Sequence, residues 1–299
     1  MSLSDLLKKG RLQIAWSYTA GGVLWQIQTG SGRFLVGEDR EIGRKETSFF
    51  CIERRTGQIF WRNVNPGDRW WIGVEAVTDD VVVFHGFASP DMPGHRSVTV
   101  ADLESGAILW SNPDLRFLAL KEGSITARVE SHGKRQVVQV AVLTGEILKK
   151  FDPDVVEPCR LSTGEDSTGD GVLLPAPVRD EAGREPAIVR CLNRYVTGGL
   201  QTAQVFLLDF SGLVLLQSSE PRMGQQEGHP NMRTVLKIVD MGDGRLMYSD
   251  ILQERTSVAS PHFFVQDGVL YYVRERTTLS ALFLSGGVFR DRVGQKDWA

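Results

Sequence analysis

The residues best suited to bind a ligand lie in one stretch, Phe84 to His95, with the sequence Phe-His-Gly-Phe-Ala-Ser-Pro-Asp-Met-Pro-Gly-His. The imidazoles of His85 and His95 and the carboxylate of Asp91 could together form a site for a metal ion or a phosphate ligand. We expect a long loop here, and loops of this length are often functional. Two histidines and one aspartate are nevertheless a weak metal signature, so the sequence favours a rigid turn whose histidines cap backbone groups, with no bound metal.

Two hairpin motifs flank this stretch and must position it. Val100 to Trp110 has the pattern of two short strands separated by a turn. In that turn Gly106 can adopt the positive φ that a tight reversal needs, and Asp102 can accept hydrogen bonds from backbone amides. Ile52 to Trp61 repeats the same spacing around Gly57. Each motif therefore predicts a β-hairpin that ends in a tryptophan.

Weaker copies of this hairpin surround four later glycines, Gly145, Gly212, Gly244 and Gly286. Their separations indicate one repeated unit of about 40–50 residues, which is the size of a propeller blade. A fold made of repeated blades explains why the motif returns, whereas an ordinary sandwich would not need to repeat it.

The run Ala-x-Asp-x-x-(Thr/Ser)-Gly-x-x-x-Trp resembles the blade motif of quinoprotein-type, or PQQ-repeat, β-propellers, which are WD40-like in architecture. The resemblance implies that Trp61 and Trp110 dock between neighbouring blades, with Tyr248 as a substitute in a later blade. The stretch from His85 to His95 also resembles a loop of an uncharacterised family of cytoplasmic propeller proteins. That second resemblance implies no function.

We therefore expect an all-β fold, a β-propeller of about six four-stranded blades, with five or seven also open. It should form a single domain over residues 1–299, which begins with a short N-terminal helix at Ser2 to Gly10. The segment Leu12 to Tyr18 could complete the blade begun at the C-terminus, or Val288 to Arg292 could supply that strand. Ala187 to Leu192 is predicted to be an inner strand.

Composition narrows the classes of function. The 299 residues carry a formal net charge of −3, which gives no electrostatic footprint for a nucleic-acid backbone and leaves only a local basic patch open. No run is long and apolar enough to span a membrane, and the N-terminus lacks a signal-peptide pattern, so we expect a cytoplasmic protein. The three cysteines share no metal-ligand spacing.

No nucleophile elbow, P-loop, dinucleotide fingerprint or HExxH motif is present. We expect a non-catalytic scaffold that binds an unidentified protein or small molecule and needs no cofactor. The alternative is a propeller enzyme, either a metal-dependent hydrolase or a quinone-cofactor oxidoreductase. An enzyme needs convergent polar groups, but the expected channel positions are apolar or aromatic, as at Trp25, Trp71, Phe117 and Phe263. Trp25, Trp70 and Trp71 could line a ligand groove, although packing within the blades is favoured.

Overall fold

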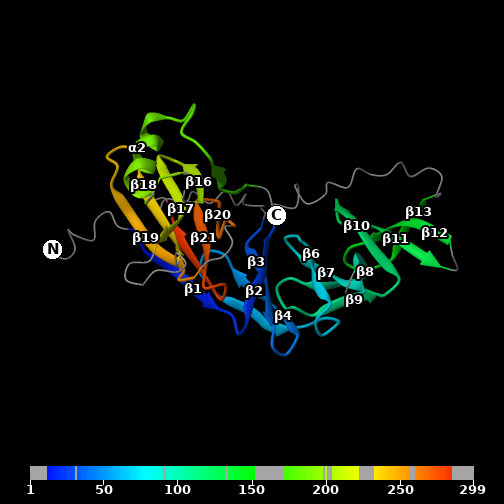
Figure 1. Ribbon diagram of the computed structural model, residues 1–299. Coiled ribbons are helices and arrows are strands. Elements are labelled where there is room, and N and C mark those ends of the chain that lie inside the picture. The colour runs from blue at the N-terminus through cyan, green and yellow to red at the C-terminus, as the bar shows by residue number, and fades with distance from the viewer. Residues whose placement is uncertain are drawn as a thin grey trace, which may run out of the picture. The chain divides into compact units, whose positions relative to one another are not determined.

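The computed structural model describes residues 12–30, 32–89, 92–131, 134–151, 171–197, 199–200, 204–221, 232–255 and 260–284 (Figure 1). The chain divides into two compact units. Unit 1 comprises Met1–Trp16, Leu173–Arg274 and Ser280–Ala299, and unit 2 comprises Ser17–Val172 and Glu275–Leu279. The helix predicted at Ser2 to Gly10 lies outside the described residues.

Unit 2 contains three four-stranded antiparallel sheets, each of which follows the order of the chain. The first sheet consists of β2 (Val23–Thr29), β3 (Phe34–Glu41), β4 (Glu46–Glu53) and β5 (Ile59–Val64). The second sheet consists of β6 (Ile72–Val77), β7 (Val81–Ser89), β8 (Met92–Asp102) and β9 (Ile108–Asn112). The third sheet consists of β10 (Leu115–Lys121), β11 (Ser124–Ser131), β12 (Lys134–Ala141) and β13 (Ile147–Phe151).

Two further sheets have five strands each. One follows the chain through β15 (Ala176–Val178), β16 (Val205–Phe210), β17 (Leu213–Pro221), β18 (Met232–Asp240) and β19 (Leu246–Gln253), and lies in unit 1. The other has the order β1 (Ile14–Thr19), β22 (Thr278–Phe283), β21 (Val269–Arg274), β20 (Phe263–Gln266) and β14 (Val172–Leu173). The N-terminal strand therefore pairs with a C-terminal strand, which is one of the two pairings that the sequence left open.

The expected all-β fold is confirmed, and its repeated antiparallel meanders are propeller-like. The described residues form five sheets, fewer than the six repeats found in the sequence. Two of those repeats belong to one sheet, because the turn at Gly212 joins β16 to β17 and the turn at Gly244 joins β18 to β19. A turn glycine marks a hairpin, and one sheet can contain two hairpins.

Local turn chemistry explains the hairpins. Gly57 and Gly106 have φ values of 74° and 72°, in the left-handed region that glycine adopts without steric cost. Asp102 accepts a hydrogen bond of 2.7 Å from the backbone N–H of Ser105. The Ser105 hydroxyl also donates to Asp102. This hydroxyl and the backbone amides of Ser105 and Glu104 lower the pKa of the Asp102 carboxyl.

Each tryptophan of the motif contacts the turn of the following sheet. Nε1 of Trp61, in the first sheet, donates a 2.8 Å hydrogen bond to the carbonyl of Leu103 in the second sheet. Nε1 of Trp110, in the second sheet, donates a 2.8 Å bond to the carbonyl of Val142 next to the third sheet. The indole of Trp61 also lies against Gly106, where an added Cβ would come within 3.0 Å of the ring.

Apolar side chains fill the spaces between successive sheets of unit 2. Val82 and Phe84 of β7 pack with side chains of the first sheet, whereas Val81 and Val83 pack with the third. Alternate residues of a strand point to opposite faces, so both faces of the second sheet are buried. This explains why β7 begins with an uninterrupted apolar run.

The strand predicted at Ala187 to Leu192 was wrong, because this segment lies in helix α2 (Pro186–Tyr195). Its buried side chains are Ile188, Cys191 and Leu192, three and four residues apart, which is the spacing of one helix face. Pro186 occupies the first turn, where its missing N–H costs no hydrogen bond. No helix in the described part of the chain is long and apolar enough to cross a membrane.

Candidate ligand-binding site

The stretch predicted as a loop is largely a hairpin. His85 lies in β7, which runs to Ser89, and His95 lies in β8, which begins at Met92. The long-loop prediction was therefore wrong. Glycine and proline suggested irregular structure, but the ladder between β7 and β8 continues through Phe87 opposite His95. Asp91 lies outside the described residues.

The structure brings His85 and His95 together and adds a residue that sequence reasoning missed, Glu75 of β6. Oε2 of Glu75 lies 2.6 Å from Nδ1 of His85 and 2.8 Å from Nδ1 of His95. The two imidazole rings stack with their centroids 3.6 Å apart and their planes 8° apart. The only sequence signal for Glu75 was a carboxylate within an otherwise apolar strand.

These three side chains differ in their access to solvent. The side chains of His85 and Glu75 are 7% and 15% exposed, whereas that of His95 is 37% exposed. Burial alone would raise the pKa of the Glu75 carboxyl, but the two adjacent imidazoles outweigh burial and lower this pKa to about 2. The cluster therefore consists of a largely buried carboxylate, a buried imidazole and one imidazole that solvent can reach.

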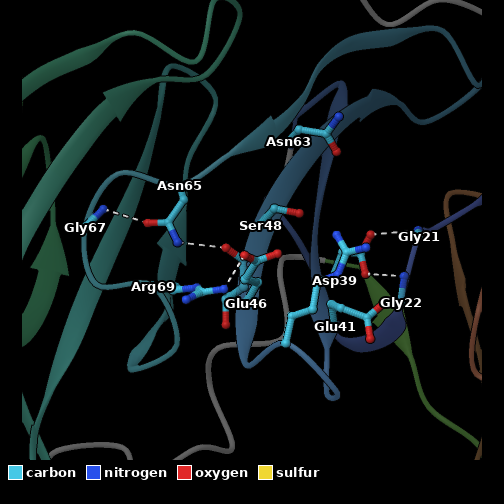
Figure 2. Close-up of a pocket in the computed structure, with 12 residues that line it drawn as sticks. Gly21, Gly22, Asp39, Glu41, Glu46, Ser48, Asn63, Asn65, Gly67 and Arg69 are labelled. Atoms are coloured by element: carbon cyan, nitrogen blue, oxygen red, sulfur yellow. Dashed lines mark hydrogen bonds and ion pairs between the residues drawn. The ribbon is translucent and has the colours of Figure 1, made fainter.

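A second feature of unit 2 is a polar pocket at the end of the first sheet where β3 turns into β4. Its cavity measures about 790 Å³. Figure 2 shows Asp39 beside Gly21 and Gly22, and on another side of the pocket Asn65, Gly67 and Arg69. The polar pocket is lined by Gly21, Gly22, Asp39, Glu41, Arg44, Glu46, Thr47, Ser48, Asn63, Asn65, Gly67 and Arg69.

Several charged groups of the polar pocket are already engaged. Asp39 accepts hydrogen bonds of 2.8 Å from the backbone N–H groups of both Gly21 and Gly22. Arg69 donates to Glu46 at 2.5 Å (Figure 2). These hydrogen bonds within the protein hold Asp39, Glu46 and Arg69 in place, so these side chains form the walls of the pocket.

The segment that follows β5 is held in place by its own side chains. Asn65 donates to the carbonyl of Thr47 at 2.7 Å and accepts from the backbone N–H of Gly67 at 2.9 Å. Asp68 accepts from the N–H groups of Trp70 and Trp71 at 2.9 and 2.8 Å. The backbone amides of Trp71 and then Trp70 lower the pKa of the Asp68 carboxyl. This wall of the pocket is thus preorganised.

Three polar side chains of the pocket remain available to a ligand. Within the described residues, Arg44, Ser48 and Asn63 make no side-chain hydrogen bond or ion pair, although all three line the cavity. Arg44 and Asn63 are exposed, and Ser48 is partly buried. They offer a cation, a hydroxyl and an amide to the same space.

Trp25, Trp70 and Trp71, which the sequence suggested could line a ligand groove, lie in two different environments. Trp25 and Trp70 place their rings 5.0 and 4.9 Å from the guanidinium carbon of Arg40, which is a cation–π arrangement on both sides. Arg40 is buried and also pairs with the carboxylate of Glu38. Trp71 instead borders a separate cavity of about 390 Å³, which His85 also lines.

The fold and the pocket together define an all-β protein of repeated meander sheets with a polar cavity at one sheet end. Residues 27–110 match the family described as Domain of unknown function (DUF4905), a range that holds the Glu75 cluster and most of the polar pocket. A search of curated proteins finds none that matches this chain.

Among solved structures, the chain is similar to the uncharacterized protein lmo1340 from Listeria monocytogenes EGD-e. The sequence identity is 9%, the TM-score is 0.33, and the alignment covers 87% of this chain and 94% of the other. A likeness of this size supports no argument about function.

Proposed function

We propose that the protein is a non-catalytic binding scaffold whose polar pocket holds a small ligand that carries an acidic group and hydroxyl groups. The observation that supports this function is that the cavity of about 790 Å³ is lined by two kinds of polar side chain, those that bond within the protein and those that do not. Its walls are fixed by internal hydrogen bonds, while Arg44, Ser48 and Asn63 are left to face a ligand.

The chemistry of these three groups selects the ligand class. An arginine guanidinium binds a carboxylate through two parallel hydrogen bonds. A hydroxyl such as that of Ser48 and an amide such as that of Asn63 both donate and accept, which suits ligand hydroxyl groups. Among the described residues, the pocket lining contains no aromatic side chain, so flat apolar ligands gain no stacking surface from them.

The pocket carboxylates fit recognition better than catalysis. A general base must be within reach of a substrate proton and free to accept it. Asp39 instead accepts hydrogen bonds from two backbone amides, Glu46 is paired with Arg69, and Glu41 accepts a bond of 3.3 Å from the backbone N–H of Gly43. Walls fixed before binding lower the entropy cost of holding a ligand, which supports a binding role.

We also propose that residues 1–299 form one propeller of the PQQ-like class and that the protein is cytoplasmic. The docking of Trp61 and Trp110 on the turns of following sheets supports the propeller proposal. The free, buried thiols of Cys51 and Cys191 support a reducing compartment.

The test is isothermal titration calorimetry of the full chain with D-glucuronate, citrate and D-gluconate as acidic probes and with D-glucose as the uncharged probe. We expect at least one acidic probe to bind with a Kd of about 1 mM or tighter. R44Q should abolish this binding, and R62Q should not, because Arg62 is an exposed arginine of the same strand as Asn63 but does not line the pocket. Failure of all three acidic probes, or equal binding by R44Q, would contradict the proposal.

A second candidate function is a metal-dependent hydrolase, which the cluster of Glu75, His85 and His95 favours. Two imidazoles and a carboxylate form the ligand set of several hydrolytic zinc sites. The distinguishing assay is cleavage of p-nitrophenyl phosphate and p-nitrophenyl acetate by the zinc-loaded chain. A rate that E75Q abolishes would favour the hydrolase, and no rate above that of free zinc would reject it for these substrates.

A further inference from the structure

The Glu75 cluster, defined as Glu75, His85 and His95, comes from three adjacent strands of the second sheet. Gly73 of β6 pairs directly with His85 of β7, and Phe87 of β7 pairs directly with His95 of β8, so the register places His85 beside β6 and His95 one strand further along the sheet. Irregularities interrupt the ladders at Glu75 and at His85. Such bulges redirect side chains, and here they accompany the convergence of three ligand atoms within 4.8 Å of one another.

The buried polar atoms of the cluster lie close to one another as ion pairs but lack well-directed hydrogen bonds. Oε2 of Glu75 and both ring nitrogens of His85 make no hydrogen bond within the described part of the chain. Nδ1 of His85 is only 2.6 Å from Oε2, so the contact is close but lacks the direction of a hydrogen bond. Buried polar groups are almost always hydrogen-bonded, and a role in binding an ion is one of the few explanations for those that are not.

We propose that Glu75, His85 and His95 bind a divalent transition-metal ion of the zinc class. Imidazole nitrogen and carboxylate oxygen are the ligands that Zn²⁺ accepts at about 2.0–2.2 Å. Mg²⁺ and Ca²⁺ prefer all-oxygen sites, which this cluster does not offer. Three protein ligands leave a fourth position for water or an added ligand, and His95, whose side chain is 37% exposed, gives the cluster access to solvent.

Binding requires a small opening of the cluster. Ligands at about 2.0–2.1 Å from a tetrahedral ion lie about 3.3 Å apart, which is farther than the present 2.6 and 2.8 Å between Oε2 and the two Nδ1 atoms. The stacked rings must also splay from their nearly parallel arrangement. His95 can rotate because it is partly exposed, whereas His85 is 7% exposed and is held beside Phe87 and Gly73.

Gly73 explains how the buried imidazole fits. A Cβ at this position would lie 3.0 Å from Cε1 and 3.2 Å from Nε2 of His85. The same position lies 3.7 Å from Oε2 of Glu38. The absence of a side chain at residue 73 thus leaves the room in which the His85 ring is seated, and a fixed ring is what a preorganised ligand needs.

The experiment is calorimetric titration of the untagged full chain with Zn²⁺, after treatment with a chelator and its removal. We expect one Zn²⁺ per chain. H95Q and E75Q should each weaken binding by at least about ten-fold, because even outer-shell changes at metal sites cost that much. Titration with Co²⁺ should give visible ligand-field absorption in the wild type that H95Q loses.

Two variants outside the cluster serve as controls. H262Q removes a histidine of unit 1, and D243N removes a carboxylate that is 58% exposed, so both should bind Zn²⁺ as the wild type does. If E75Q does not fold, H95Q decides, because His95 is partly exposed and lies outside the apolar core. No Zn²⁺ binding by the wild type, or equal binding by H95Q, would overturn the inference. Binding of acidic probes in the polar pocket should be unchanged in H95Q, so the two proposals fail separately.

Discussion

Replacing Gly106 by alanine should destabilise unit 2 more than the same replacement at Gly123. Both glycines have φ of 72°, so the backbone strain of an alanine is the same at each site. They differ in surroundings. An added Cβ at Gly106 would lie 3.0 Å from two atoms of the Trp61 indole, whereas at Gly123 no heavy atom of the described residues lies within 4 Å.

The magnitudes follow from these two terms. An alanine in the left-handed backbone conformation costs about 1–2 kcal/mol. Alanine also reduces the conformational freedom of the unfolded chain, which offsets about 0.4–1 kcal/mol of this cost. G123A should therefore lower the free energy of unfolding by about 1 kcal/mol. G106A adds overpacking of about 1–3 kcal/mol, because the hydrogen bond from Trp61 to Leu103 resists a shift of the ring. Its total cost should be about 2–4 kcal/mol.

Urea unfolding of the full chain, followed by tryptophan fluorescence and circular dichroism, measures both costs. Adding W61A should remove the extra cost of G106A and leave that of G123A unchanged, as a double-mutant cycle would show. Equal costs for the two glycine variants would refute the conclusion that Trp61 packs against the turn of the following sheet.

Two further predictions concern ionisable groups. The pKa of Asp68 is lowered in the folded chain. The ionised carboxylate therefore stabilises the fold above its unfolded pKa of about 3.9, and this stabilisation is lost as pH falls through the lower folded pKa. The unfolding midpoint of D68N should depend less on pH in that acidic range than the midpoint of the wild type. Burial raises the pKa of the Cys51 thiol to about 12, so at pH 8 only about one thiol in 10⁴ is ionised. Because the thiolate is the form that reacts with iodoacetamide, peptide mass spectrometry should find Cys51 alkylated only when the chain is unfolded in urea.

The hairpins could be predicted because their determinants are local. Asp102 and Gly106 lie within one turn, and their roles follow from hydrogen bonding and φ alone. The number of sheets could not be derived the same way, since a glycine such as Gly212 marks a turn without showing which hairpins share a sheet. Helix α2 was missed because a short apolar run has no clear period, and the surrounding repeats favoured a strand.

The candidate sites needed the tertiary structure. His85 and His95 were identified by residue type, but Glu75 depended on strand register and on two bulges, which one sequence does not reveal. The polar pocket collects residues from Gly21 to Arg69, and in the sequence Arg44 or Asn63 looks like any surface residue. Arg44 and Asn63 stand out only in the structure, because the other polar side chains around them are already hydrogen-bonded within the protein.

The most direct test of the proposed binding function is chemical-shift mapping of the ¹⁵N-labelled full chain during titration with the tightest of the acidic probes. The polar-pocket account predicts that the largest shifts belong to the backbone amides of Gly21, Gly22, Ser48 and Asn63, and that R44Q removes them. Shifts centred elsewhere in the chain, or the same shifts in R44Q, would contradict it.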